Sequence, residues 1–239
     1  MDITIYLICF NEEVLIPNTL DHYYKRFPKA KIIILDNEST DRSVEIALAR
    51  GCEVVSWKSK NEANIIILTD LKNSVWKTAE TDWVIIADMD EWAEICEADL
   101  IDENAKGSTI LHFKGIQVVA ESESLTLDDI DLHGLKRGYP DVWFNKHVCF
   151  KRSAITEMNY TRGCHKSAEK GLVKYSKRVY ILKHMNFLGF PWYQAKMKAR
   201  YARTYFNRNK LRCSGHYMND DASIIKRFNQ VKAAAKDIL

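Results

Sequence analysis

The feature that most constrains the fold is an alternation of short β-branched runs with segments of helix length. Apolar strands are expected near residues 3–9, 31–35, 53–57 and 83–87, and helices near 12–26, 40–50 and 62–80. Strands that are separated by helix-length connections pair in parallel, with helices on both faces of the sheet. The sequence therefore predicts an α/β fold with a Rossmann-like, mostly parallel central sheet. Such sheets bind ligands beyond the carboxyl ends of their strands.

The pattern loosens after residue 105. The segments STILHF, GIQVVA, KHVCFK and RVYILK are interpreted as strands of mixed direction, and helices are expected near 192–208 and 221–236. An acidic, loop-like stretch, SESLTLDDIDLHG, lies between the second and third of these strands. Because no internal repeat or Pro/Gly-rich linker interrupts the chain, we expect residues 1–239 to form a single domain.

Composition indicates an intracellular globular protein without a membrane span. The chain has 239 residues, of which 46% are hydrophobic, and this is enough for a full core. Its longest aliphatic runs, such as IIIL, are far shorter than the ~20 apolar residues that cross a bilayer. The start, MDITIYLICF, has an acid where a secretory signal has lysines. The six cysteines are scattered without a C-x-x-C pair, which favours a reducing compartment, and we expect a cytoplasmic location.

The small net charge of +3 conceals an asymmetry between the two halves of the chain. Residues 1–120 contain 12 Lys/Arg against 21 Asp/Glu, or −9, whereas residues 121–239 contain 23 against 11, or +12. An acidic half can hold a cation, and a basic half can meet an anionic substrate or surface. Nucleic-acid binding would favour a cationic surface throughout, so we expect no nucleic-acid partner.

Polar groups follow three of the expected strands at the point where each strand ends. The first strand ends in CFNEE, the second in LDNESTD and the fourth in ADMDEW. In the second segment Ser39, Thr40 or Asp41 can cap the following helix. Capping does not account for Asp36, which is well placed to accept an N–H from a nucleobase, although a structural role for this acid is the alternative.

Asp88 and Asp90 form a D-x-D pair at the end of the fourth strand. In a strand, residues i and i+2 point to the same side, so the two carboxylates are expected to converge. Hard oxygen ligands suit Mg²⁺ or Mn²⁺, which in turn neutralises a diphosphate. D-x-D also occurs by chance in acidic loops, so its meaning depends on the surrounding motifs.

Those motifs carry a family resemblance. The segments CFNEE, ILDNESTDRS and LKNSVWKTAETDWVIIADMDEW are similar, in order and spacing, to the nucleotide-sugar half of family-2-like glycosyltransferases of the GT-A fold. The resemblance covers roughly residues 3–92 and implies a DxD-containing, nucleotide-sugar-dependent enzyme, with UDP as the favoured nucleotide and Mn²⁺ or Mg²⁺ as the cofactor. It also implies that residues 1–105 bind the donor and that residues 106–239 bind the acceptor, a hydroxyl of a glycan, lipid or protein-linked group.

The resemblance implies a role for particular residues. Asp36 would bind the donor base, Phe10, Asn11 and Glu12 would line the nucleoside pocket, and Lys72 would lie near the base and phosphates, where the family often has arginine. Asp88 would face the ribose or the metal, and Asp90 would coordinate the metal. A later segment, ILKHMNFLGFPW, is similar to a histidine-bearing strand end in several GT-A enzymes, so His184 would be the third metal ligand, with His165 as its rival.

The acceptor half must supply a general base if the enzyme inverts configuration, and the sequence leaves the stereochemistry open. Asp141 is the first candidate, because the aromatic residues in RGYPDVWFNKH can hold a sugar ring. Glu121 is the second candidate, and Glu91 and Glu169 are rivals. A cationic stripe on the expected helix at 192–208 reads as a solvated face, or else as a contact to donor phosphate or to an anionic acceptor; its members are Lys196, Arg200 and Arg203.

Three other functions are alternatives to the glycosyltransferase. A metal-dependent nucleotidyltransferase would use the same carboxylates, but LDNESTD lacks the Gly-rich, basic phosphate loop expected there. A phosphatase of the aspartyl-phosphate type would have Thr or Val where this chain has Trp92. A non-enzymatic module could use the basic second half to bind RNA or a membrane surface, and peripheral membrane contact also stays open for the transferase.

Overall fold

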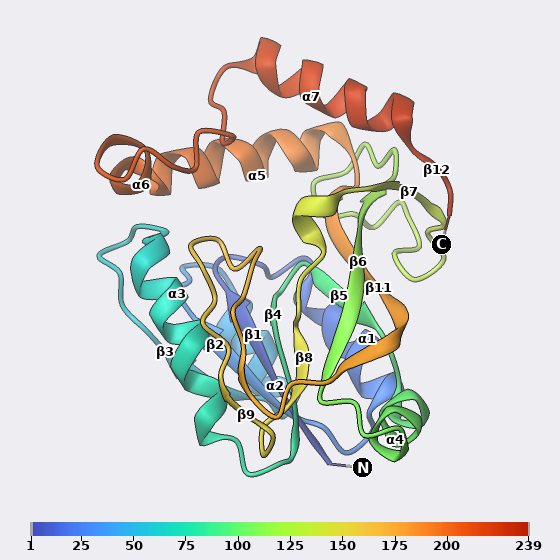
Figure 1. Cartoon of the computed structure of the whole chain (residues 1–239). Coiled ribbons are helices and arrows are strands. Elements are labelled where there is room, and N and C mark those ends of the chain that lie inside the picture. The colour runs from blue at the N-terminus through green and yellow to red at the C-terminus, as the bar shows by residue number, and fades with distance from the viewer. Residues whose placement is uncertain (1, 239) are drawn as a thin grey trace.

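The computed structural model describes residues 2–238, and its main element is a ten-stranded sheet (Figure 1). Four strands from the first part of the chain lie side by side in the order β3 (Glu53–Ser56), β2 (Lys31–Asp36), β1 (Ile3–Cys9) and β4 (Trp83–Asp88). All three pairings between them are parallel. The predicted α/β class with a parallel central part is therefore confirmed.

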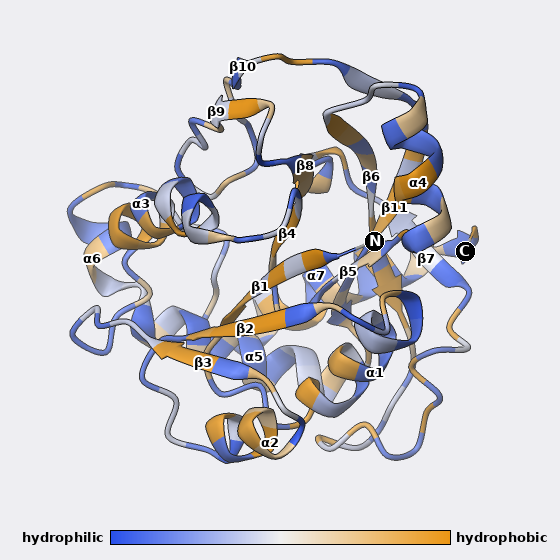
Figure 2. Ribbon diagram, turned by 90° about the horizontal axis from the view of Figure 1, so that it is seen from below, coloured by the Kyte–Doolittle hydropathy of each residue, from blue (hydrophilic) through white to orange (hydrophobic). Residues whose placement is uncertain are grey.

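Helices cover both faces of this parallel part. α1 (Ile16–Arg26) and α2 (Ser43–Ala49) pack on one face, and α3 (Ile65–Ser74) with the 3₁₀ turn η1 (Val75–Thr78) packs on the other. Alternate side chains of β1 point to opposite faces, so Leu7 belongs to the same core cluster as Leu20 of α1, while Tyr6 belongs to the cluster that contains Trp76 of η1. Figure 2 shows the hydrophobic strands β1 and β2 at the centre of the molecule.

The second part of the chain extends the sheet with mixed pairing. It contains β6 (Ile110–Val119), β7 (Arg137–Pro140), β8 (Cys149–Lys151), β11 (Tyr175–Phe187) and β12 (Lys236–Asp237), and a small separate sheet of β9 (Ile155–Glu157) and β10 (Lys170–Gly171). β8 joins antiparallel to β4, and β6 pairs in parallel with β11. The two strands predicted around STILHF and GIQVVA form one strand, β6, that continues through Gly115.

β5 (Glu91–Glu94) and α4 (Glu97–Ala105) were not predicted from the sequence. β5 starts directly after the D-x-D turn and runs antiparallel to β11, so that Glu91 lies opposite His184. On its other side β11 pairs with β6, and there His184 lies opposite Gln117. This double register carries His184 from the second part of the chain to the end of β4.

The C-terminal helices lie beyond the carboxyl ends of the parallel strands (Figure 1). α5 (Phe190–Arg203) and α6 (Tyr205–Asn209) replace the single helix predicted at 192–208, with a break at the buried Thr204. α7 (Asp221–Ala234) matches the predicted last helix and packs on α5. Within residues 2–238, no helix is both long enough and apolar enough to cross a membrane.

Candidate active site

Asp90 is the centre of a buried charged cluster at the carboxyl end of β4. Its side chain is almost fully buried, and one oxygen, Oδ2, contacts Nε2 of His184 at 3.3 Å, Nζ of Lys196 at 2.9 Å and the guanidinium of Arg200 at 2.8 Å. Burial alone would raise the pKa of Asp90, but the charges of Lys196 and Arg200, together with the contact to His184, hold the pKa well below its ordinary value. Asp90 is therefore a carboxylate at neutral pH.

The orientation of His184 is fixed by a chain of side-chain hydrogen bonds. Gln117 donates from Nε2 to Asp141 Oδ2 at 3.1 Å, so its carbonyl oxygen faces His184 Nδ1 at 2.7 Å. Since an amide oxygen only accepts, Nδ1 carries a proton, and in the neutral imidazole the lone pair is on Nε2, facing Asp90. The ring of Phe144 stacks on the imidazole with centroids 4.1 Å apart. Gln117 and Phe144 thus orient His184 as supporting residues orient metal-bound histidines.

Asp88 points to a different set of partners. Its Oδ1 contacts Nζ of the buried Lys72 at 2.6 Å, and its Oδ2 lies 3.6 Å from Nζ of Lys146. Lys146 also pairs with the fully buried Glu91, which accepts the backbone N–H of Asp88 at 3.1 Å. Burial alone would raise the pKa of Asp88, but the two lysines lower it.

The two aspartates therefore do not converge as a regular strand would direct them. β4 ends at Asp88 and the chain turns at residues 89 and 90, so the two-residue periodicity stops between them. Met89 is buried in the core on the α1 face. The structure brings Asp90 and His184 together and turns Asp88 toward lysines.

The residues expected to bind the nucleoside surround the ends of β1 and β2. Asp36 is buried and accepts the backbone N–H of Ser39 at 3.2 Å, a contact that shapes the turn after β2. Asn11 has a positive φ of 49° and its side chain accepts the N–H of Thr40 at 2.7 Å. Arg203 lies over the ring of Phe10 at 3.2 Å from its centroid. Asp36 thus has the structural role that we held as its alternative, and base binding by Asp36 stays a prediction.

Glu12 and Lys72 are both buried, unlike residues of an open binding surface. Glu12 is buried beside Asp90, pairs with Lys196 at 3.0 Å, and its pKa is raised by burial. Burial alone would lower the pKa of Lys72, but the contact with Asp88 raises it above the ordinary value. Lys72 therefore forms an ion pair with Asp88. Its predicted contact with the base or the phosphates stays a prediction.

The candidate bases differ in their surroundings. Asp141 begins the short turn η2 (Val142–Phe144) and is connected to His184 through Gln117. Glu121 pairs instead with Arg137 at 3.1 Å and Lys232 at 2.9 Å, and these contacts lower its pKa. Among the two candidates, Asp141 is the one that the hydrogen bonds join to the cluster.

Both rival bases are engaged elsewhere. Glu91 is fully buried against Lys146, and Glu169 accepts hydrogen bonds from Ser167 and Tyr175 and contacts His147. These contacts outweigh burial and lower the pKa of Glu169 to about 2. A carboxylate with such a low pKa is a weak proton acceptor.

His165 is held away from Asp90 by the η2 turn. Its Nδ1 bonds the backbone oxygen of Trp143 at 2.6 Å, and its ring meets Phe144 edge-on. Burial lowers the pKa of His165. His184, the preferred histidine, is the one that lies beside Asp90.

Sequence reasoning missed Lys146 and Gln117. Lys146 lies 55 residues from its partner Glu91, and Gln117 lies 67 residues from His184. Neither stands in a motif. The only signal available in the sequence was that Gln117 and Lys146 lie in the expected strands GIQVVA and KHVCFK of the second part.

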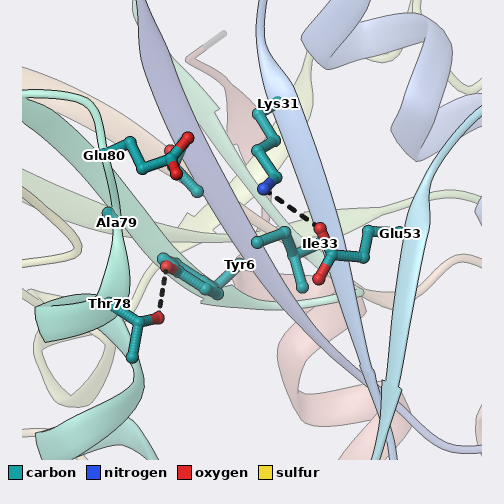
Figure 3. A pocket seen from close by; sticks show the side chains of 8 residues that line it. Tyr6, Lys31, Ile33, Glu53, Thr78, Ala79 and Glu80 are labelled. Atoms are coloured by element: carbon teal, nitrogen blue, oxygen red, sulfur yellow. Dashed lines mark hydrogen bonds and ion pairs between the residues drawn. The ribbon is translucent and has the colours of Figure 1, made fainter.

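A hollow lies at the opposite, amino end of β1 and β2 (Figure 3). It is lined by Tyr6, whose hydroxyl contacts Thr78 at 3.3 Å, and by the exposed ion pair of Lys31 and Glu53 at 3.1 Å. This hollow contains none of the predicted site residues, so we assign the site to the carboxyl ends of the strands.

The donor groups around Asp90 suit a divalent cation in part. A buried carboxylate and an imidazole whose Nε2 is available are ligands that Mn²⁺ and Mg²⁺ sites use. In residues 2–238, however, the side chains form no group of three or more His, Cys, Asp or Glu that could hold a metal ion. Asp90 and His184 thus fit two positions of a metal site, which a bound phosphate and water would complete.

The first part of the chain matches a known protein family. Residues 4–95 match the family model "Glycosyl transferase family 2". This segment contains β1 to β4 and includes Asp36, Asp88 and Asp90. The match supports a glycosyltransferase.

The individual proteins that this chain resembles have low sequence identity to it. Protein RfbJ of Shigella flexneri is 29% identical over 65 residues, which are 27% of this chain and 50% of that protein. The chain thus spans about half the length of that relative. S. aureus TarS is 12% identical with a TM-score of 0.49, over 96% of this chain and 43% of TarS. Glucosyl-3-phosphoglycerate synthase of Mycobacterium tuberculosis, in complex with Mn²⁺, UDP and glucosyl-3-phosphoglycerate, is 21% identical with a TM-score of 0.31, over 48% of this chain and 44% of that chain.

Proposed function

We propose that this protein is a metal-dependent glycosyltransferase that moves a sugar from a nucleoside-diphosphate donor, with UDP favoured, to an acceptor hydroxyl. The observation that carries the proposal is the contact between buried Asp90 and His184 at the carboxyl end of β4. It lies at the edge of the sheet where α/β proteins bind ligands, and Asp90 is inside the family-2 match.

In this proposal the donor half comprises residues 1–105 and the acceptor half residues 106–239. Asp36, Phe10 and Asn11 surround the base and ribose of the donor. Asp90 and His184 would hold Mn²⁺ or Mg²⁺, and the bound cation would supply positive charge against the departing diphosphate. The acceptor is a hydroxyl of a glycan, lipid or protein-linked group.

The residues of this chain prepare the site before the donor binds. Gln117 holds neutral His184 in the tautomer that has its proton on Nδ1, so that the unprotonated Nε2 faces Asp90. Lys72 and Lys146 hold the Asp88 carboxylate in its charged form, where it can accept hydrogen bonds from ribose hydroxyls. Asp141 takes the proton of the acceptor hydroxyl as that oxygen attacks the anomeric carbon. Because these groups are fixed by buried contacts, little reorganisation is needed during the reaction.

A thermal-shift screen tests donor and metal together. UDP-, GDP- and dTDP-sugars are added to the protein with Mn²⁺ or with EDTA, and the melting temperature is measured. Binding to the native state stabilises it by about 2.7 kcal/mol at a hundredfold excess over Kd. We expect the UDP-sugar with Mn²⁺ to give the largest shift. Equal sugar transfer in excess EDTA would refute the metal requirement.

His184 and His165 can be separated by their effect on metal affinity. We expect His184→Ala to weaken Mn²⁺ binding in the presence of UDP, because it removes the nitrogen that faces Asp90. His165→Ala is the matched control, since that histidine bonds Trp143 instead. Paramagnetic relaxation of water protons gives the Mn²⁺ affinity without any turnover. Weak Mn²⁺ binding only in His165→Ala would move the ligand to that loop.

A further inference from the structure

The cationic stripe of helix α5 is not a solvated face. Lys196, Arg200 and Arg203 lie on one side of helix α5, four and three residues apart. The helix itself lies beyond the carboxyl ends of the parallel strands (Figure 1). Lys196 contacts Asp90 at 2.9 Å and Arg200 contacts the same carboxylate at 2.8 Å. Arg203 donates to Asn37 Oδ1 at 2.6 Å. The helix therefore contacts the proposed donor site both at Asp90, after β4, and at Asn37, after β2.

Hydrogen-bond capacity around Asp90 is unbalanced. Lys196, Arg200 and His184 all approach the single oxygen Oδ2, and a carboxylate oxygen offers about two lone-pair positions. A lysine ammonium has three N–H groups and a guanidinium has five. The contacts with Asp90 therefore use only part of the N–H groups of Lys196 and Arg200, and an additional anion with several oxygens would use the rest.

The charges of the same groups indicate how much negative charge that anion should carry. By formal charge, the two cations Lys196 and Arg200 balance the two acids Asp90 and Glu12. A divalent cation bound to Asp90 would leave an excess of two positive charges. A diphosphate carries negative charge of this order on several oxygens, and its geometry suits a lysine and an arginine side by side.

We propose that Lys196 and Arg200 form the subsite for the diphosphate of the donor, and that the two side chains exchange Asp90 for phosphate oxygens when the donor binds. The inference rests on the proposed function, because it takes a nucleoside diphosphate as the ligand. Helix α5 then connects the acceptor half to the donor and closes over it through these contacts.

Calorimetric titration of nucleotides tests this subsite directly. UDP and uridine are titrated with Mg²⁺ into the parent and into Lys196→Gln and Arg200→Gln. We expect Kd for UDP to rise at least about tenfold in each variant, because a charge-assisted hydrogen bond is lost, while Kd for uridine stays unchanged. Lys198→Gln is the matched control on the same helix, since Lys198 is exposed and pairs with Asp221. It should bind both ligands like the parent.

Two further arms separate this inference from its premise. Lys196→Arg keeps the charge and should restore UDP affinity, which a merely structural defect would not allow. Inorganic pyrophosphate in EDTA probes the cations without base or metal, and both glutamine variants should bind it more weakly. Unchanged UDP affinity, or an equal loss for UDP and uridine, would overturn the subsite. Absence of sugar transfer in a parent that binds pyrophosphate through these residues would instead refute the proposed function alone.

Discussion

Replacing Asp90 with asparagine is expected to reduce sugar transfer by at least about a thousandfold. The variant loses the charge that holds the metal and so loses several kcal/mol of transition-state stabilisation. Asparagine keeps the size of the side chain and one acceptor oxygen, so the turn after β4 can be retained. Turnover is measured as UDP release with the donor sugar that gives the largest thermal shift.

The same substitution should also lower stability, because Asp90 balances two cations at a buried position. Removing one partner of a buried ion pair costs about 3–5 kcal/mol, and the partial exposure of Arg200 places this variant toward the lower end. Urea unfolding measures the loss. Asp221→Asn serves as the control, since its pair with Lys198 is screened by solvent and its loss should leave the unfolding midpoint nearly unchanged. An activity loss that merely follows the unfolded fraction would contradict a role in catalysis.

Local sequence pattern was sufficient for the parallel part of the fold. The strands at 3–9, 31–36, 53–56 and 83–88 lie where β-branched runs predicted them. For β1, β2 and β4 the reason is that burial on both faces requires continuous apolar segments. The pattern failed at β5, whose short sequence EWAE reads as an acidic turn. This strand exists because it pairs with β11, which lies about ninety positions further along the chain, and a local pattern does not carry that information.

The site shows the same division between local and distant information. Asp36, Asp88 and Asp90 could be selected because strand ends meet at one edge of the sheet. Their partners could not be assigned, since Lys146 and Lys196 reach Glu91 and Asp90 from 55 and 106 positions away. For the basic residues of α5 the local pattern therefore favours a solvated face and leaves a phosphate or acceptor contact as the alternative, whereas the fold places Lys196 and Arg200 against acids of the first half.

The general base gives the second large effect. We expect Asp141→Asn to lower kcat by about 10²- to 10⁴-fold, because an amide cannot take the proton of the acceptor hydroxyl. Nucleotide affinity, measured with UDP in the absence of a divalent cation, should stay within error of the parent, since Asp141 is joined to the donor half only through Gln117 and the metal ligand His184. Glu121→Gln is the matched control and should keep full activity, because Glu121 pairs with Arg137 and Lys232.

The position of Asp141 explains why this residue is favoured over its rivals. The η2 turn is fixed on β6 by two hydrogen bonds, from Asp141 N to Gly115 O at 3.0 Å and from Gly115 N to Asn145 Oδ1 at 2.8 Å. A Cβ at residue 115 would lie 2.3 Å from Cβ of Phe144, so only glycine allows this approach. Trp143 is 64% exposed on the turn and offers a face on which a sugar ring can stack. Full activity of Asp141→Asn, with loss in Glu121→Gln, would place the acceptor on the other side of β6, beside α7.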